Sequence, residues 1–210
     1  MTGRVSADGR TAAIILSAGA ATRMGQLKQL LVYRGRTLLQ HSIDQAVGAG
    51  FEPIIVVAGS GFQMLHDSIA GQPVEMVQNE NWQSGMGSSI IAGMQALLEQ
   101  DEVPFAVAIL VADQPLIEAK HLAAMRQLLF STETSIVAAQ YSGTIGVPAM
   151  FKHELFHALI SLPSEAGARN LLRASDAKVS PFPLAEAAID IDTPEDFDVL
   201  TSGVESRHQR

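Results

Sequence analysis

The sequence has no cysteine and few charged residues. Its 210 residues include no Cys, and 17% are charged while 47% are hydrophobic. The lack of cysteine excludes a disulfide framework, a thiolate nucleophile and a zinc or iron–sulfur site with Cys ligands. A chain of this length and hydrophobicity can bury a sizeable core, so we expect a compact globular fold rather than a disordered chain.

The sequence also lacks an excess of positive charge and a long hydrophobic run. The formal net charge is −8 at pH 7, which disfavours general binding to nucleic acid or to an anionic membrane, so an anionic ligand needs local cations. Residues 1–10 have no apolar core of the signal-peptide kind, and the longest apolar run, 103–112, contains Pro104 and is too short to span a bilayer. We expect a cytoplasmic protein with no nucleic acid or membrane partner.

Apolar runs that suit buried strands alternate along the chain with segments of helical periodicity. The predicted strands are 12–16, 53–59, 74–77, 105–112, 135–140 and 146–151. The predicted helices are 37–50, 61–69, 88–100, 118–129, 153–162, 166–173 and 193–200. This alternation predicts an α/β fold with a Rossmann-like, mostly parallel sheet flanked by helices. We expect a single domain over residues 12–200, with frayed ends at 1–11 and 202–210.

A loop of small residues follows the first predicted strand and leads to two cations. Residues 16–28 read LSAGAATRMGQLK and contain Arg23 and Lys28. Small side chains leave the backbone N–H groups near Gly19 open to phosphate oxygens, and the two cations would neutralise their charge. The loop is neither the G-x-G-x-x-G of dinucleotide binders nor a P-loop. We expect a triphosphate site here; the alternative is an ordinary loop with two solvated cations.

Two acidic segments could supply metal ligands. Asp113 follows the apolar run 105–112 directly, where ligands collect beyond the carboxyl ends of strands in open α/β sheets. Mg²⁺ is typically held by one or two carboxylates together with substrate phosphates. The second segment, 190–196, offers Asp192, with Asp190 in reserve. Both segments have an alternative as helix caps, because Pro115 and Pro194 stand at predicted helix starts.

A glycine-rich segment opens the helix predicted at 88–100. Gly85, Met86, Ser88 and Ser89 follow Trp82, and their amides and hydroxyls could hydrogen-bond a base or a ribose. An N-cap serine and a tryptophan that only packs are the alternative.

His153 and His157 spell the H-E-x-x-H motif of zinc hydrolases on a predicted helix. Two His at i and i+4 share a helix face, so a zinc site has the correct spacing. No third ligand is marked downstream, and the apolar residues between them suit a core-facing stripe. A zinc hydrolase is therefore an alternative of another class.

The order of these motifs resembles that of the MobA-like nucleotidyltransferases, and among them the molybdenum cofactor cytidylyltransferases. Residues 16–28 resemble the pattern L-A-A-G-x-S-x-R-M-G-x-x-K, except at Ser17 and Ala21. Asp113 stands in the family's G-D-Q-P, with Ala112 in place of Gly, and the closing acidic segment resembles D-x-D-T-P-E-D.

Three further segments are similar to family patterns. The segment around Trp82 resembles N-x-x-W-x-x-G-M-x-x-S, and 141–151 resembles Y-x-G-x-x-G-x-P-x-x-F. Residues 164–169 resemble G-D-x-G-A-R, with Ser164 and Glu165 in place of Gly and Asp.

The resemblance implies a nucleotide-diphospho-sugar transferase type of fold and a role for each matching residue. Metal ligation falls to Asp113 and Asp192, and catalysis to Arg23, Lys28 and Asp113. The nucleotide-binding residues are Ala18, Gly19, Ala20, Arg23, Lys28, Gly85, Met86, Ser88 and Ser89. The acceptor-binding residues are Gly146, Pro148 and Arg169.

The resemblance also implies a reaction. It is the Mg²⁺-dependent transfer of CMP from CTP to the phosphate of molybdenum-molybdopterin, which gives molybdopterin cytosine dinucleotide and pyrophosphate. A molybdenum hydroxylase would receive this product. The alternatives are a guanylyltransferase or other NTP transferase with a different phosphorylated acceptor, and a non-catalytic accessory protein that carries the cofactor.

Overall fold

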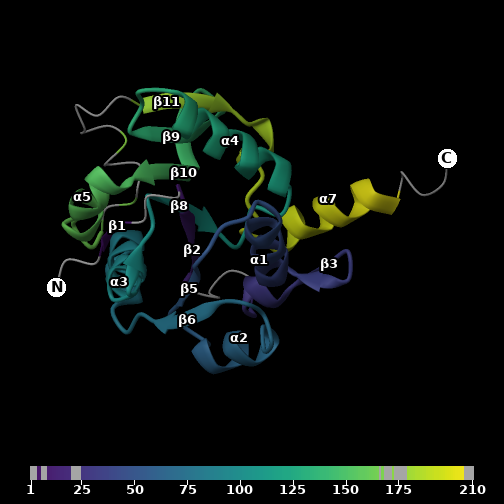
Figure 1. Cartoon of the computed structure of the whole chain (residues 1–210). Coiled ribbons are helices and arrows are strands. Elements are labelled where there is room, and N and C mark those ends of the chain that lie inside the picture. Colours follow the sequence, from purple (N-terminus) through teal and green to yellow (C-terminus); the bar gives the residue numbers. More distant parts are fainter. Residues whose placement is uncertain are drawn as a thin grey trace.

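The computed structural model describes residues 4–5, 9–19, 25–165, 167, 172 and 179–205. Within these residues, seven strands form a central sheet in the order β11-β9-β10-β8-β2-β5-β6 (Figure 1). The strands are β2 (Thr11–Ser17), β5 (Ile54–Ala58), β6 (Glu75–Gln78), β8 (Ala106–Val111), β9 (Ile136–Tyr141), β10 (Thr144–Lys152) and β11 (Val179–Pro183). Strand β10 is antiparallel to both of its neighbours, and the other pairs are parallel. The predicted mostly parallel α/β sheet is therefore confirmed.

Several short strands and one edge strand were not predicted. Strand β1 (Arg4–Val5) pairs with β7 (Glu102–Val103), and β3 (Val32–Tyr33) pairs with β4 (Arg36–Thr37). Two residues are too few to give an alternating pattern. Strand β11 carries Pro181 and Pro183 and lies at the sheet edge, the position to which proline is confined in sheets.

Most helix ends in the structure lie within a few residues of the predicted ends. They are α1 (Leu38–Gly48), α2 (Phe62–Ser68), α3 (Met86–Leu98), α4 (Ala119–Ser131), α5 (Phe156–Ile160) and α7 (Pro194–Glu205). Most of the helix predicted at 166–173 lies outside the described residues. Strand β1 and the end of α7 lie within the two terminal segments that we expected to fray. None of the helices among the described residues is long and apolar enough to cross a membrane.

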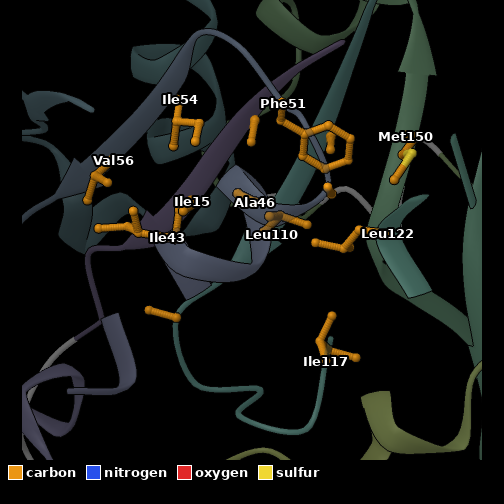
Figure 2. Packing of buried hydrophobic residues seen from close by; sticks show 14 of the residues in the cluster. Ile15, Ile43, Ala46, Phe51, Ile54, Val56, Leu110, Ile117, Leu122 and Met150 are labelled. Carbon is orange, nitrogen blue, oxygen red and sulfur yellow. The ribbon is translucent and has the colours of Figure 1, made fainter. Parts of the chain in front are cut away.

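The helices cover both faces of the sheet. Helices α3 and α5 lie on one side and α1 and α4 on the other (Figure 1). Alternate residues of β2 serve the two faces: Ile15 packs with Ile43 and Ala46 of α1 (Figure 2), whereas Ile14 packs under α3. Both β2 residues are fully buried, so the central strand is fixed from both sides.

Two local features hold helices α1 and α3 in place. Helix α1 begins with a capping box in which Thr37 and Gln40 each bond the other's backbone N–H. Helix α3 lies close to the sheet because Gly93 has no side chain: a Cβ there would lie 2.6 Å from Cγ2 of Ile14. The carboxyl ends of β2 and β8 are adjacent, with Leu16 opposite Val111, and both point to the same edge of the sheet.

Candidate active site

A cavity of about 290 Å³ opens at this edge of the sheet. Its walls come from the ends of β2 and β8, the turn at Lys28, and the start of α3. It is lined by Leu16, Ala18, Gly19, Lys28, Gln29, Trp82, Gln83, Gly85, Met86, Ser89, Val111, Ala112 and Asp113. Most of the predicted nucleotide-binding residues that the structure describes thus lie around one space.

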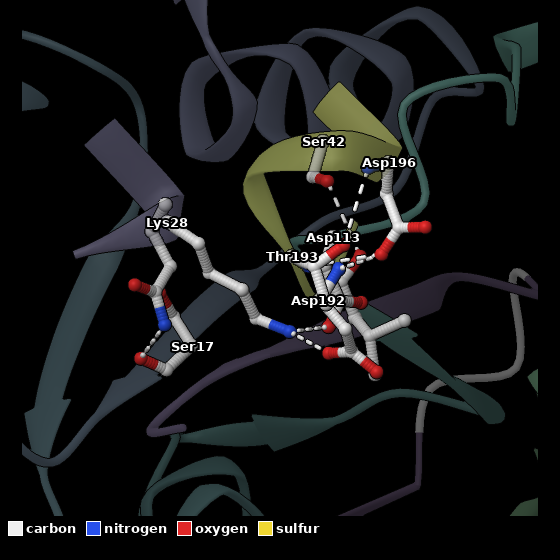
Figure 3. A network of polar contacts seen from close by, with 9 residues as sticks. Ser17, Lys28, Ser42, Asp113, Asp192, Thr193 and Asp196 are labelled. Atoms are coloured by element: carbon white, nitrogen blue, oxygen red, sulfur yellow. Dashed lines mark hydrogen bonds and ion pairs between the residues drawn. The ribbon is translucent and has the colours of Figure 1, made fainter. Parts of the chain in front are cut away.

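Lys28 lies between the two carboxylates that we predicted as metal ligands (Figure 3). Its Nζ donates to Oδ2 of Asp113 at 2.6 Å and to Oδ1 of Asp192 at 2.7 Å. The side chains of Lys28 and Asp113 are 14% and 22% exposed, while that of Asp192 is 53% exposed. Residues from three distant parts of the sequence therefore meet at one point beside the cavity.

The electrostatics of this cluster follow from its geometry. Burial lowers the pKa of Lys28, but the adjacent Asp113 carboxylate and the hydrogen bonds to both Asp side chains outweigh burial and leave that pKa raised. Asp190 has a raised pKa, first because its carboxyl group is partly desolvated and then because the negative charge of Asp113 lies near it. Lys28 therefore stays positively charged between the carboxylates of Asp113 and Asp192.

Helix α7 presents Asp192 without using it as a cap. Thr193 Oγ1 accepts a hydrogen bond from the Asp196 amide at 3.2 Å, and Asp196 Oδ2 accepts from the amides of Thr193 and Asp192 at 2.9 and 3.1 Å. The Ile191 amide donates to the Asp113 carbonyl at 3.0 Å, which ties the segment before α7 to the end of β8. The helix cap is thus Thr193, and the Asp192 carboxylate is left to face Lys28.

The loop before α3 is held by a close backbone contact. Gly85 has φ +117°, and a Cβ there would lie 2.8 Å from Cα of Glu165, so only glycine suits the position. The Ser88 amide donates to the Ser164 carbonyl at 3.1 Å. The loop before α3 therefore packs directly against Ser164 and Glu165, the two residues that depart from the family pattern.

Six residues that line the cavity were not predicted as ligands: Leu16, Gln29, Trp82, Gln83, Val111 and Ala112. Trp82 packs on the end of β5, where a Cβ on Gly59 would lie 2.4 Å from Cγ of Trp82. Gln29 is buried and donates from Nε2 to the Ser17 carbonyl at 3.1 Å. Gln83 follows Trp82 in the same loop. The resemblance of its segment to N-x-x-W-x-x-G-M-x-x-S could have indicated Trp82, whereas only closeness in sequence to Lys28 and Gly85 could have indicated Gln29 and Gln83.

The predicted acceptor residues do not line this cavity among the residues that the structure describes. Gly146 lies in β10, where a Cβ would lie 2.6 Å from Oη of Tyr141. Pro148 is buried beside a smaller hollow shared with His41 and Ser42 of α1. Their roles stay predictions. Ala20, Arg23 and Arg169 lie outside the described residues, so their predicted roles carry no geometry.

His153 and His157 do not share one regular helix. A 3-10 turn covers His153–Leu155 and α5 begins only at Phe156. The His153 ring packs against Phe105 in a tilted arrangement, with centroids 5.0 Å apart and an angle of 50° between the ring planes, and Glu154 accepts a hydrogen bond from the Ser135 hydroxyl. Nowhere in the described part of the chain do three or more His, Asp or Glu side chains form a group that could hold a metal ion. The contacts here are those of packing residues.

The pair Asp113 and Asp192 suits a divalent cation that also contacts a substrate. Both carboxylate oxygens approach the same point, where the Lys28 ammonium shows that a positive charge is accommodated. Hard oxygen ligands are those that Mg²⁺ and Mn²⁺ prefer, and two carboxylates suffice when substrate phosphates complete the coordination.

Comparison with known proteins identifies the family to which this chain belongs. Residues 13–179 match the family model of the MobA-like NTP transferase domain. The chain is 35% identical over 103 residues to the nicotine blue oxidoreductase of Paenarthrobacter nicotinovorans, which covers 49% of this chain and 48% of that protein. It is 28% identical over 185 residues to the molybdenum cofactor cytidylyltransferase of Escherichia coli strain K12. This alignment covers 88% of this chain and 92% of that protein.

Solved structures share the fold. Rv0371c from Mycobacterium tuberculosis H37Rv superposes with a TM-score of 0.79 at 23% identity, covering 91% of this chain and 97% of that chain. A complex of the same protein with manganese gives a TM-score of 0.74 at 22% identity over the same shares of the two chains. The predicted fold, that of the nucleotide-diphospho-sugar transferases, is thus confirmed.

The match spans about half the length of the nicotine blue oxidoreductase but more than nine tenths of the cytidylyltransferase. The family match covers well over half of this chain, from the strand before the small-residue loop to the last strand of the sheet. It confirms the predicted class of enzyme, a nucleotidyltransferase. The chain belongs to the MobA-like NTP transferase domain family.

Proposed function

We propose that this protein transfers CMP from CTP to the phosphate of molybdenum-molybdopterin, with molybdopterin cytosine dinucleotide and pyrophosphate as products. The observation that carries the proposal is the meeting of Lys28, Asp113 and Asp192 beside a cavity lined by Gly19 and Gly85. A cation, two carboxylates and a loop of small residues are what a nucleoside triphosphate and its metal ion require. The cytidylyltransferase relative, matched over most of its length, supports the choice of CTP and of the acceptor.

In this proposal an oxygen of the acceptor phosphate attacks the α-phosphorus of CTP. The bond from that phosphorus to the bridging oxygen breaks, and pyrophosphate leaves with the electron pair. The acceptor phosphate is largely ionised near neutral pH, because its second pKa is about 6, so no strong general base is needed. The work left to the protein is to orient two anions and to stabilise the charge that develops on the leaving group.

The residues of this chain divide that work. The Lys28 ammonium, together with Arg23, neutralises the phosphates, and the amides around Ala18, Gly19 and Ala20 orient them. Asp113 and Asp192 would hold Mg²⁺, which would supply a Lewis acid that stabilises negative charge on the phosphate oxygens. Gly146, Pro148 and Arg169 contact the acceptor. A molybdenum hydroxylase would then receive the product.

The relative named as an oxidoreductase does not change this choice. The sequence lacks the G-x-G-x-x-G loop that binds the pyrophosphate of a nicotinamide or flavin dinucleotide. Nucleotidyl transfer uses the groups that are at the site, a lysine and two carboxylates.

The test is to incubate the purified protein with each of the four NTPs, Mg²⁺ or Mn²⁺, and purified molybdenum cofactor. Pyrophosphate release and the mass of the product are then measured. We expect turnover with CTP and a product one cytidylyl group heavier than the acceptor. Turnover with GTP alone would indicate a guanylyltransferase. Binding of the cofactor without turnover with any NTP would contradict the enzymatic proposal and favour a carrier.

A further inference from the structure

Asn79 is a buried polar side chain that follows β6 and contacts the start of α3. It is 5% exposed. Its Oδ1 accepts from the Asn81 amide at 2.9 Å, and its Nδ2 lies 2.9 Å from Ser88 Oγ and 3.0 Å from Ser89 Oγ. A backbone N–H can only donate, so the carbonyl of Asn79 must face Asn81 and its NH₂ group must face the serines. Both amide protons are therefore given to the two hydroxyl oxygens.

Ser88 spends its hydroxyl within the protein. Its Oγ accepts from Asn79 and lies 2.7 Å from the Gly85 carbonyl and 3.0 Å from the Asn81 carbonyl, so its single proton goes to one of these two oxygens. These bonds close the loop between Asn81 and α3. Ser88 does not belong to the cavity wall, and we assign it a role in holding the loop rather than in contacting a nucleotide.

Ser89 differs from its neighbour in one respect. It lines the cavity, and its Oγ accepts a hydrogen bond from Asn79. Across the described ranges of the chain, no oxygen accepts the Ser89 proton. Because the Asn79 amide occupies the acceptor side of this hydroxyl, the O–H is left as a donor for whatever enters the cavity.

We propose that Asn79 is a positioning residue that fixes Ser89 as a hydrogen-bond donor to the nucleoside part of the bound NTP. The inference rests on the proposed function, because it takes the cavity to be the nucleotide site. Lys28 and Asp113 suit the phosphates by charge, whereas Trp82, Met86 and Ser89 offer apolar, aromatic and hydroxyl surface that suits a base or a ribose. The pocket therefore selects a nucleoside with an acceptor oxygen facing Ser89.

Two substitutions test the polarity of this hydrogen bond. Ser89→Ala removes the donor. Asn79→Asp keeps the shape of the side chain but replaces the NH₂ group by a carboxylate oxygen, which attracts the Ser89 proton away from the cavity. Neutral hydrogen bonds of this kind contribute about 3- to 10-fold in affinity. We expect both variants to bind CTP about 3- to 10-fold more weakly by calorimetry in the presence of Mg²⁺, and the double variant to lose no more than Ser89→Ala alone.

Nucleotide analogues identify the acceptor and separate this role from a merely structural one. The wild type should discriminate against either 2-thio-CTP, which weakens the base acceptor, or 2′-deoxy-CTP, which lacks a ribose oxygen. Ser89→Ala and Asn79→Asp should both lose that same discrimination, while Ser88→Ala, which loosens the loop, should keep it. Retained discrimination in Ser89→Ala, or in a folded Asn79→Asp, would overturn the inference.

The design distinguishes the two proposals. Calorimetry requires no acceptor, so it tests the hydrogen bond even if no pyrophosphate is released. Failure of turnover in the wild type contradicts the proposed function alone. If Asn79→Asp does not fold, as judged by thermal unfolding, Ser89→Ala with the two analogues still decides whether the hydroxyl is a donor.

Discussion

Replacing Lys28 by methionine removes the ammonium group that lies between Asp113 and Asp192. Methionine keeps most of the length of the side chain but cannot donate to the two oxygens 2.6 and 2.7 Å from Nζ. Asp113, whose side chain is 22% exposed, then loses its cation, and the Asp192 carboxylate lies nearby with the same negative charge.

The size of the effect follows from the burial of these groups. Removing one partner of a fully buried ion pair costs about 3–5 kcal/mol, and an exposed pair contributes about 0.2–1 kcal/mol. The pair with Asp113 lies between these limits, and the pair with Asp192 lies near the exposed limit. We expect a decrease of about 2 kcal/mol in the free energy of unfolding, or about 4–8 °C in Tm for a chain of this size. Turnover should fall about 10²- to 10³-fold, as when one donor to a developing oxyanion is lost.

The response to metal should have the opposite sign. Without the ammonium, two carboxylates repel each other, so a divalent cation should bind the variant more tightly than the wild type before any nucleotide is present. Thermal unfolding with and without excess Mg²⁺, and Mn²⁺ titration by calorimetry, measure both effects. Lys28→Arg keeps the charge, and Lys120→Met removes a lysine that is 71% exposed; both should respond to Mg²⁺ as the wild type does. A methionine variant with unchanged Tm and unchanged metal affinity would refute the geometry on which the site is built.

Three further predictions concern single positions. Asp113→Asn should abolish metal-dependent pyrophosphate release, and unchanged release would reject its role as a ligand. Gly85→Ala should lower the free energy of unfolding in urea more than Gly71→Ala and should also weaken CTP binding, because the new Cβ meets Glu165. Gly71, at φ +81°, has open space around it, so its substitution costs only backbone strain of about 1–2 kcal/mol. Equal effects of the two substitutions would contradict the contact between Gly85 and Glu165. Hydrogen bonds from Thr193, and from the Asp192 amide, lower the pKa of Asp196 in the folded protein. The stability that this carboxylate adds is therefore complete above the pKa of an Asp in the unfolded chain, about 4, and is lost as pH falls through the lower pKa of the folded state. The difference in urea midpoint between the wild type and Asp196→Asn should shrink over that acidic range; a difference that does not change with pH would contradict the assignment.

Most of the sheet and its helices could be predicted from the sequence because burial on both faces leaves unbroken apolar runs. Strand β8 lies within a run of eight consecutive apolar residues, 105–112, and β2 contains a run of five, 12–16. Strand β11 could not be predicted, since its two prolines argue against an interior strand and are tolerated only at the edge.

Of the charged residues predicted for the site, Lys28, Asp113 and Asp192 lie together in the structure, but their hydrogen bonds could not be predicted. Lys28 and Asp113 stand next to a loop and a strand end that the sequence marks clearly. Whether Asp192 or Thr193 caps α7 depends on which side-chain oxygen accepts from the Asp196 amide. Both residue types are common caps, so the sequence could not distinguish them. The same is true of Ser88 and Ser89, which are identical in sequence terms and differ only in what their hydroxyls contact.

Helix α7 and the segment before it bring Asp192 to the site from beyond the last strand of the sheet. This segment is anchored through a small apolar group in which Ile191 and Leu200 meet Tyr33 and Leu38. A chain shortened to end after Pro183 would keep all seven strands of the central sheet, Lys28 and Asp113, but it would lose Asp192. Under the proposed function, such a chain would offer one of the two carboxylates to the metal ion, so the segment before α7 would decide whether both are present at the site.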